Sequence, residues 1–365
     1  MSSESSGVVR VGIVGYGLAG SVFHAPLVSS TPGMTVAAIV SGDPERQARA
    51  RRDFPNATIY ATADEMLADP SKLDLVVVAA PNRAHVPVGL AALEAGLPVV
   101  IDKPLAPSTS DAERLLEAAK RRGKLLSVFQ NRRWDNDFLT VRKLIDADLL
   151  GTVTRFESRF ERFRPTLKGG WRELGDPEEG GGLLFDLGAH LIDQALVLFG
   201  WPTSVYTEMS VRREGALVDD DTFVALRFPG GEVAHLWMSV IPRQPGPRLR
   251  LVGMRGVYEK QDLDPQEEAL RTGMRPGDEG WGEEPRERWG HLVTSVDDVP
   301  FDGHVETVPG SYEMYYVLVR DALVHGGPPP VMAESSLATL RIIEAARESA
   351  RLGQVVAPSN PNIIG

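Results

Sequence analysis

The sequence predicts an α/β fold, in which a doubly wound parallel sheet is followed by an α+β domain with a large, mostly antiparallel open sheet. In the first third of the chain, short and continuously apolar runs alternate with helical segments, a pattern typical of a parallel sheet covered on both faces. After residue 131 the chain changes to strands joined by hairpin turns, which indicates an antiparallel sheet. We therefore expect one domain over residues 1–131 and a second over residues 132–365.

The elements of the first domain follow from its apolar runs and helix signals. A helix is expected from the turn after the first strand to about residue 30, another from Pro44 onward, and two more at residues 88–96 and 111–122. Gly123 directly follows the last of these, where glycine commonly ends a helix. Strands are expected at residues 8–14, 35–40, 74–80, 98–101 and 124–129.

In the second domain, residues 153–163 alternate between two kinds of side chain. Phe156, Ser158 and Phe160 fall on one side and charged residues on the other, which predicts a half-buried strand ending near Arg162. Glycine-containing turns predict two hairpins, formed by residues 221–228 with 232–240 and by residues 248–252 with 257–260.

The remaining part of the second domain is less regular. Residues 261–309 are rich in glycine, proline and charge, and we expect one short helix opened by Asp264 and Pro265, followed by a long loop. Two helices, at residues 312–325 and 335–352, are expected to close the chain.

Composition excludes several classes of protein. With 365 residues the chain is long enough for two cores, and its 42% apolar and 24% charged residues are typical of a globular protein. A net charge of −11 argues against nucleic-acid binding. No apolar run is long enough for a membrane span, and residues 1–7 lack the features of a signal peptide, so we expect a cytoplasmic protein. The absence of cysteine excludes disulfides and thiolate chemistry.

A glycine-rich turn follows the first predicted strand. Its pattern G-x-G-x-x-G lies between a strand and a helix, the context in which such a turn binds a dinucleotide. Gly15 permits the tight turn, Gly17 allows backbone N–H groups to approach a pyrophosphate, and Gly20 lets helix and strand pack closely. The sequence therefore predicts a Rossmann-type cofactor site at Gly15, Tyr16, Gly17, Leu18, Ala19 and Gly20.

The end of the second strand bears on which dinucleotide binds. An NAD site usually has an acidic residue there for the ribose 2′-hydroxyl. The nearest acid is Asp43, but Pro44 follows it, and the pair is also typical of a helix N-terminus. If Asp43 caps the helix, Ser41 faces the 2′ position of the ribose, and Arg46, one turn further on, is a possible partner for the 2′-phosphate of NADP. NADP is therefore favoured over NAD.

Three residues are candidates for the chemistry. Lys103 follows the fourth apolar strand, at the edge where open α/β sheets bind ligands, although a surface lysine would look the same. Asp186 and His190 are four residues apart on a predicted helix, so their side chains lie on one face. An intrahelical hydrogen bond or two ligands of a metal would also fit that spacing. No third metal ligand lies nearby in the sequence, and we expect no metal site.

Several segments together resemble the Gfo/Idh/MocA oxidoreductase family over nearly the whole chain. The glycine turn is one of them, and the motif Asp102-Lys103-Pro104 corresponds to the family's usual Glu-Lys-Pro. More narrowly, the chain resembles the NADP-linked scyllo-inositol dehydrogenases. The segments that carry this narrower resemblance are residues 23–27, 130–135 and 160–165 and Trp171-Arg172-Glu173. The family resemblance also rests on Ala80-Pro81-Asn82 with His85 and on the run from Gly180 into Asp186 and His190.

The resemblance implies a hydride-transferring dehydrogenase acting on a secondary alcohol of a cyclic polyol or sugar. His190 would exchange the hydroxyl proton, Lys103 would stabilise the developing alkoxide beside the same carbon, and Asp186 would orient the substrate or the imidazole. The resemblance also implies a homodimer or homotetramer formed through the open sheet. Further contacts with the cofactor or substrate are implied for Pro81, Asn82, His85, Asp102, Lys103, Gln130, Trp171 and Arg172.

Two alternatives remain open from the sequence. One is a related sugar dehydrogenase, or a reductase of ketosugars or anhydrosugars, because the shape of the substrate pocket is not visible in the sequence. The other is a dinucleotide-binding regulator without turnover. The intact set of Lys103, Asp186 and His190 favours an enzyme, since a sensor does not need a proton-transferring group.

Overall fold

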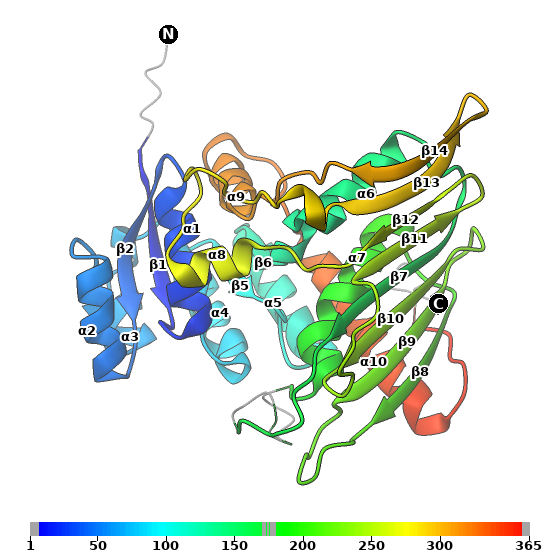
Figure 1. The fold of residues 1–365 in the computed structure, drawn as a ribbon. Helices are drawn as coiled ribbons and strands as arrows, with labels where there is room; N and C mark the ends of the chain where they lie inside the picture. The colour runs from blue at the N-terminus through cyan, green and yellow to red at the C-terminus, as the bar shows by residue number, and fades with distance from the viewer. Residues whose placement is uncertain (1–6, 170–172, 174, 176–179, 360–365) are drawn as a thin grey trace. The chain divides into compact units, whose positions relative to one another are not determined.

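A computed structural model describes residues 7–169, 173, 175 and 180–359 (Figure 1). The chain forms two compact units. Unit 1 consists of Met1–Asn131 together with Gln266–Trp281 and Ser311–Leu337. Unit 2 consists of Arg132–Pro265 together with Gly282–Gly310 and Ala338–Gly365. Each unit is described by itself.

Unit 1 is built on a six-stranded sheet with the order β3-β2-β1-β4-β5-β6, in which all neighbouring strands are parallel. Strands β4 and β6 are buried throughout and β1 and β5 nearly so, as the apolar runs predict for a sheet covered on both faces, whereas the edge strand β3 is partly exposed. The doubly wound parallel sheet is thereby confirmed. Its strands are β1 Val9–Val14, β2 Met34–Val40, β3 Thr58–Tyr60, β4 Leu75–Val78, β5 Val99–Asp102 and β6 Leu126–Phe129.

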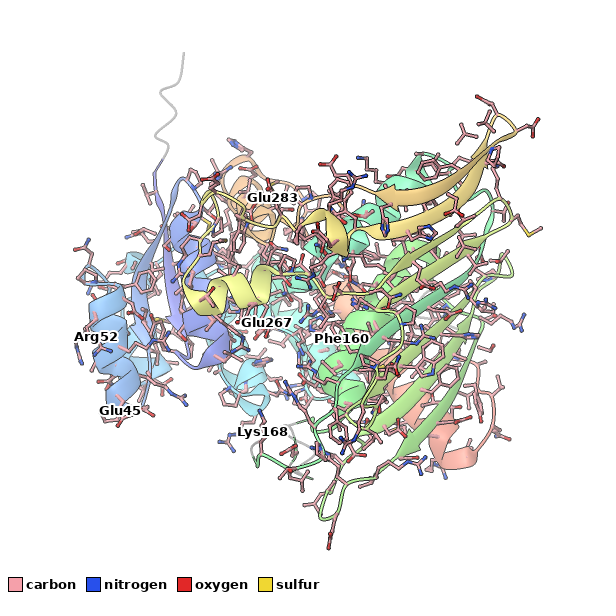
Figure 2. The ribbon with its side chains drawn as sticks, in the orientation of Figure 1. Glu45, Arg52, Phe160, Lys168, Glu267 and Glu283 are labelled. Atoms are coloured by element: carbon pink, nitrogen blue, oxygen red, sulfur yellow. The ribbon has the colours of Figure 1, made fainter. Side chains whose placement is uncertain are left out.

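The helices of unit 1 begin and end at residues suited to those positions. The Ser108 hydroxyl accepts the Asp111 N–H at the start of α5, and Gly123 ends that helix with φ 60°. Figure 2 shows the charged side chains of α2, among them the exposed Glu45 and Arg52. The helices are the π-helical η1 Ala19–His24, then α1 Ala25–Ser30, α2 Pro44–Asp53, α3 Ala63–Leu67, α4 His85–Glu94, α5 Thr109–Arg122, α8 Gln266–Thr272 and α9 Glu313–His325.

Two late segments of the chain pack on the early part of unit 1. Helix α9 contacts α1, and α8 contacts η1, the helix that follows the glycine turn. Ser127 of β6 donates its hydroxyl to the Val331 carbonyl, and the hydroxyl of Tyr315 on α9 donates to Ser127. Residues from late in the sequence therefore contact β6 of unit 1.

Unit 2 is built on an eight-stranded sheet with the order β14-β13-β12-β11-β7-β10-β9-β8. Neighbouring strands are antiparallel except β7 and β10, which run parallel. The mostly antiparallel sheet is confirmed. The strands are β7 Val153–Glu161, β8 Ser204–Ser210, β9 Asp221–Arg227, β10 Val233–Ser239, β11 Leu249–Gly253, β12 Val257–Lys260, β13 Gly290–Val296 and β14 Val299–Val305.

The prediction of a long loop after the short helix in residues 261–309 is wrong where β13 and β14 form an antiparallel hairpin. Its turn is Asp297-Asp298, with φ 49° and 65°, the left-handed pair that suits a two-residue hairpin. Proline, aspartate and glycine interrupt β14, whose residues are mostly exposed. The period-2 signal is weak there because β14 is an edge strand with little to bury.

Helices cover one face of the sheet of unit 2. On β7, Phe156, Ser158 and Phe160 are buried, which confirms the half-buried strand, and β7 ends at Glu161 as expected.

Within the described residues, no helix combines the length and the apolar character that a membrane crossing requires. The other α- and π-helices of the described residues are α6 Asn136–Asp146, η7 Leu184–Gly188, which is π-helical, α7 Ala189–Phe199 and α10 Ala333–Leu352, which begins in unit 1 and continues into unit 2.

Candidate active site

The glycine turn of unit 1 has no room for side chains at two of its positions. Gly15 has φ +100°, and a Cβ there would lie 2.6 Å from the Ala79 carbonyl oxygen. A Cβ on Gly20 would lie 2.0 Å from the carbonyl oxygen of Gly15. The turn therefore lies close against the end of β4, and η1 begins within it at Ala19, where the first N–H groups of a helix have no acceptor inside that helix. This cradle fits the phosphates of a dinucleotide.

We expect Gly20→Ala to disrupt this cradle, because the new methyl group would collide with backbone rather than with a flexible side chain. Overpacking of this kind costs about 1–3 kcal/mol, and we expect cofactor affinity to fall together with the melting temperature. Thermal unfolding and cofactor titration measure the two effects. Gly42→Ala is the control for stability, since its Cβ would meet only the Ala61 carbonyl oxygen at 3.9 Å. Wild-type stability and affinity in Gly20→Ala would contradict this account.

At the end of β2, Asp43 caps helix α2. Its Oδ1 accepts the N–H groups of Glu45 and Arg46 at 2.9 and 3.1 Å. The neighbouring Ser41 is buried, and its hydroxyl accepts the Asp43 N–H. Arg46 is exposed, yet its Nη1 lies only 3.5 Å from where a Cβ on Gly17 would stand. A guanidinium beside the glycine turn is suited to a phosphate.

The end of β4 leads into Pro81 and the buried Asn82. His85 follows and is 1% exposed. Its Nδ1 lies 2.8 Å from the Pro104 carbonyl oxygen and its Nε2 lies 3.0 Å from the Ala80 carbonyl oxygen. Burial lowers the pKa of the imidazole, against the raising effects of Asp102 and the two carbonyls. His85 therefore bridges the loop after β4 and the loop after β5.

Strand β5 ends at Asp102, and the next residue is Lys103, joined to Pro104 by a cis peptide bond. Asp102 Oδ1 accepts the backbone N–H of Lys103 at 2.8 Å and lies 3.9 Å from Nε2 of His24. Burial acts to raise the pKa of the Asp102 carboxyl, but His24, Lys103 and His85 outweigh it and the pKa is lowered. The carboxylate is therefore ionised. Gln130, also buried, follows β6 at the next strand end.

In unit 2, Asp186 and His190 lie on the continuous run of η7 and α7. The helix starts with a π-helical turn at Leu184, and α7 ends at Phe199, directly before Gly200. Asp219 holds its first turn, because Oδ2 accepts the Leu184 N–H at 2.8 Å. His190 is 5% exposed, and its ring centroid lies 6.5 Å from that of Phe160 on β7.

One turn after His190, Asp193 makes a salt bridge with Arg133, with two nitrogen–oxygen distances of 2.7 Å. The aspartate is buried and the guanidinium nearly so, which makes the pair a support for the helix. Among the described residues, no group of three or more histidines and acidic residues is arranged to hold a metal ion.

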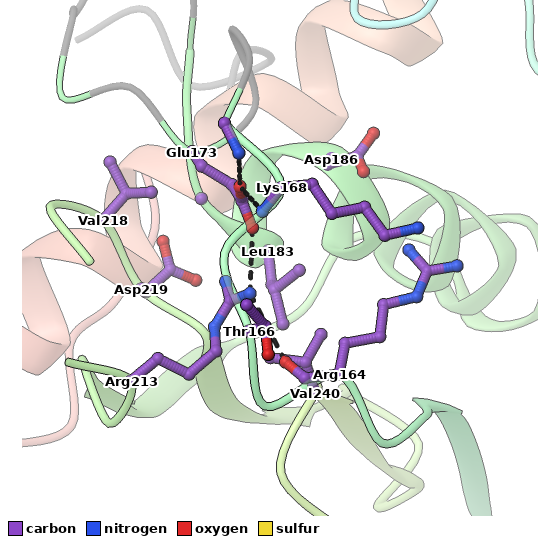
Figure 3. Close-up of a pocket in the computed structure, with 12 residues that line it drawn as sticks. Arg164, Thr166, Lys168, Glu173, Leu183, Asp186, Arg213, Val218, Asp219 and Val240 are labelled. Atoms are coloured by element: carbon purple, nitrogen blue, oxygen red, sulfur yellow. Dashed lines mark hydrogen bonds and ion pairs between the residues drawn. The ribbon is translucent and has the colours of Figure 1, made fainter. Parts of the chain in front are cut away.

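A cavity of about 230 Å³ opens beside Asp186 (Figure 3). Arg164, Lys168 and Arg213 supply cationic groups to its lining, while Asp186, Glu173 and Asp219 supply carboxyl groups. Burial raises the pKa of the Asp219 carboxyl against its hydrogen bonds. The cavity is therefore polar and charged, and hydroxyl groups of a small molecule would find both donors and acceptors in it.

A chain of charged groups holds one wall of the cavity. The Arg213 side chain, 7% exposed, donates to Asp220 at 2.9 Å and to Glu173 Oε1 at 2.8 Å. Glu173 Oε2 in turn accepts the backbone N–H groups of Lys168 and Gly169. Sequence reasoning missed Arg213, Asp219 and Asp220. The run of three aspartates at 219–221 was the only available signal, and it resembles an ordinary charged turn.

The structure therefore brings the predicted residues together in two groups. The glycine turn, Ser41, Arg46, Pro81, Asn82, His85, Asp102, Lys103 and Gln130 belong to unit 1, and Asp186 and His190 belong to unit 2. Trp171 and Arg172 lie outside the described residues.

Comparison with known proteins identifies the relatives of this chain. Residues 9–130 match the NAD-binding Rossmann fold of the Gfo/Idh/MocA oxidoreductases, and residues 142–357 match the C-terminal alpha/beta domain of the same family. The chain belongs to the Gfo/Idh/MocA oxidoreductase family. It is an oxidoreductase with an NAD(P)-binding domain.

Among its relatives, oxidoreductase YdgJ of Escherichia coli is 41% identical over 94% of this chain and 96% of that protein. The NADP(+)-linked scyllo-inositol 2-dehydrogenase IolW of Bacillus subtilis is 38% identical over 94% of both. The crystal structure of YvaA from Bacillus subtilis has a TM-score of 0.92 at 36% identity and covers 98% of this chain and all of that one. The predicted family and fold are thereby confirmed.

Proposed function

We propose that this Gfo/Idh/MocA oxidoreductase interconverts a secondary alcohol of a cyclic polyol and the corresponding ketone, with scyllo-inositol as the first substrate to test. The observation that carries the proposal is the charged cavity beside Asp186, next to the helix of His190. Its mixed donors and acceptors suit a ligand with a hydroxyl on every carbon better than an apolar alcohol. The 38% identity to a scyllo-inositol 2-dehydrogenase supports the same class.

In the proposed reaction, His190 takes the proton of the substrate hydroxyl as the C–H bond breaks and the carbonyl forms. When bound, the nicotinamide dinucleotide supplies the hydride acceptor. The ammonium of Lys103 stabilises the negative charge that develops on the oxygen, and Asp186 accepts hydrogen bonds from neighbouring hydroxyls. In the reverse direction His190 returns the proton to the oxygen of the ketone.

A substrate panel tests the proposal. Purified enzyme is mixed with NADP or NAD and with scyllo-inositol, its stereoisomers and common aldoses, and the absorbance of reduced nicotinamide is followed. We expect turnover with at least one inositol. Turnover of aldoses alone would replace the proposed substrate with a sugar, and cofactor binding without turnover of any polyol or sugar would favour the regulator.

We further propose that NADP is preferred over NAD, because Asp43 is engaged in capping α2 and Arg46 lies beside the glycine turn. Arg46→Ala should raise the KM for NADP by about 10-fold or more, since hydrogen bonds to charged groups contribute about 1.5–3 kcal/mol. The KM for NAD should stay within twofold. The matched control is Arg52→Ala, an exposed arginine on the same helix. Equal losses with both cofactors would contradict the preference.

We also propose a homodimer formed through the face of the unit 2 sheet that carries Phe223, His235 and Trp237. Phe223 and Trp237 have ring centroids 5.1 Å apart, and the guanidinium of Arg159 lies 3.8 Å from the Trp237 ring. All are partly exposed and form an aromatic surface that a second copy could cover. Sedimentation equilibrium measures the mass in solution, and a monomer at micromolar concentration would contradict the dimer.

A further inference from the structure

The turn Asp102-Lys103-Pro104 lies between two buried histidines that come from other elements of unit 1. His24, at the end of η1, is 0% exposed and approaches Asp102 on one side of Lys103. His85, at the start of α4, is 1% exposed and contacts the Pro104 carbonyl on the other. Neither imidazole is required to fill an apolar core, because a Phe or Leu would fill such space without burying polar atoms.

His24 is part of a buried polar chain that starts on α9. The Tyr316 hydroxyl lies 2.6 Å from Nδ1 of His24, and both side chains are fully buried. Burial raises the pKa of Tyr316 well above its usual value, so the hydroxyl keeps its proton and can donate it to Nδ1. When Nδ1 accepts this hydrogen bond, the ring proton of the neutral imidazole is on Nε2. Nε2 is the atom that faces Asp102, at 3.9 Å from Oδ1.

The far end of this chain is the backbone of Lys103. Asp102 Oδ1, the oxygen that faces His24, is also the oxygen that accepts the Lys103 N–H at 2.8 Å. Asp102 therefore holds the Lys103 amide by a hydrogen bond and faces the His24 imidazole at 3.9 Å, a separation too long for a hydrogen bond but short enough for electrostatic attraction. Phe129 packs on the imidazole with ring centroids 4.4 Å apart and limits its motion.

We propose that Tyr316, His24 and Asp102 form a positioning relay that fixes the backbone of Lys103 and thereby aims its ammonium at the reacting oxygen. The relay rests on the proposed function, in which Lys103 stabilises the alkoxide. Because His24 ends the helix that begins at the glycine turn, the relay ties the lysine to the element that holds the cofactor phosphates. None of the three side chains needs to touch the substrate for this role.

The test compares Tyr316→Phe with Tyr315→Phe, two adjacent and fully buried tyrosines on α9. Each variant loses one buried hydroxyl, but that of Tyr315 donates to Ser127 and not to His24. We expect both to lose similar stability. Tyr316→Phe should lower kcat by about 3- to 10-fold, the contribution of a single neutral hydrogen bond, with the KM for cofactor unchanged within twofold. Tyr315→Phe should keep the wild-type kcat.

A double-mutant cycle supplies a readout that a purely structural role would not move. If Tyr316 acts through Asp102, Tyr316→Phe should cost kcat little or nothing in an Asp102→Asn background. Equal kcat in the two tyrosine variants, or fully additive losses in the cycle, would overturn the relay. Lys103→Met separates the two proposals. Full activity in that variant overturns the proposed function and the relay with it, whereas a Lys103-dependent enzyme with a silent Tyr316→Phe overturns the relay alone.

Discussion

Replacing His190 with asparagine is expected to lower kcat for the polyol by about 10²- to 10⁴-fold, the contribution of a positioned general base. The imidazole is the group best suited to exchange a proton near neutral pH, because its ordinary pKa is about 6.5. Asparagine keeps a polar side chain of similar size but cannot take the proton. Steady-state kinetics in the direction of alcohol oxidation measures the loss.

The pH profile provides the sharper test of the same residue. In the wild-type enzyme kcat for oxidation should rise with pH as the imidazole loses its proton, and this limb should be absent in His190→Asn. A suitable control is His291→Asn in the same unit, where the imidazole pairs with Asp302 of the β13–β14 hairpin at an exposed position. An unchanged profile in His190→Asn would show that another group accepts the proton.

Replacing Lys103 with methionine is expected to lower kcat by about 10²- to 10³-fold, the loss typical of removing one donor to a developing oxyanion. Methionine keeps the length and apolar stem of the side chain and removes only the charge and the N–H donors. A substrate deuterated at the reacting carbon should show a larger isotope effect in this variant, because the chemical step becomes slower than product release.

Two further variants make the lysine result specific. Lys103→Arg retains the charge with different geometry and should be intermediate between wild type and Lys103→Met. Lys120→Met removes an exposed ammonium from helix α5 and should leave kcat unchanged. A Lys103→Met enzyme with wild-type kcat would mean that the lysine is a surface residue in a strand-to-helix loop, the alternative that the sequence left open.

Local signals were sufficient for most of the scaffold. Apolar runs mark the buried parallel strands because these strands have no solvent-facing side, and Asp43, Ser108 and Gly123 mark helix ends through hydrogen bonds made within a few residues. The hairpin β13–β14 was not predicted, because an edge strand that buries few side chains has a weak alternation of apolar and polar residues. The parallel pairing of β7 with β10 was not predicted either, since strand order depends on contacts between distant segments.

By itself the sequence determined the two kinds of sheet, the glycine turn and the strand end that carries Lys103, because spacing along the chain controls each of these features. Only the tertiary structure decided which distant groups meet. Tyr316 lies 292 residues from His24, and Arg213 lies 40 residues from Glu173. Such pairs depend on how the elements pack, and side chains so far apart in sequence leave no periodic signal.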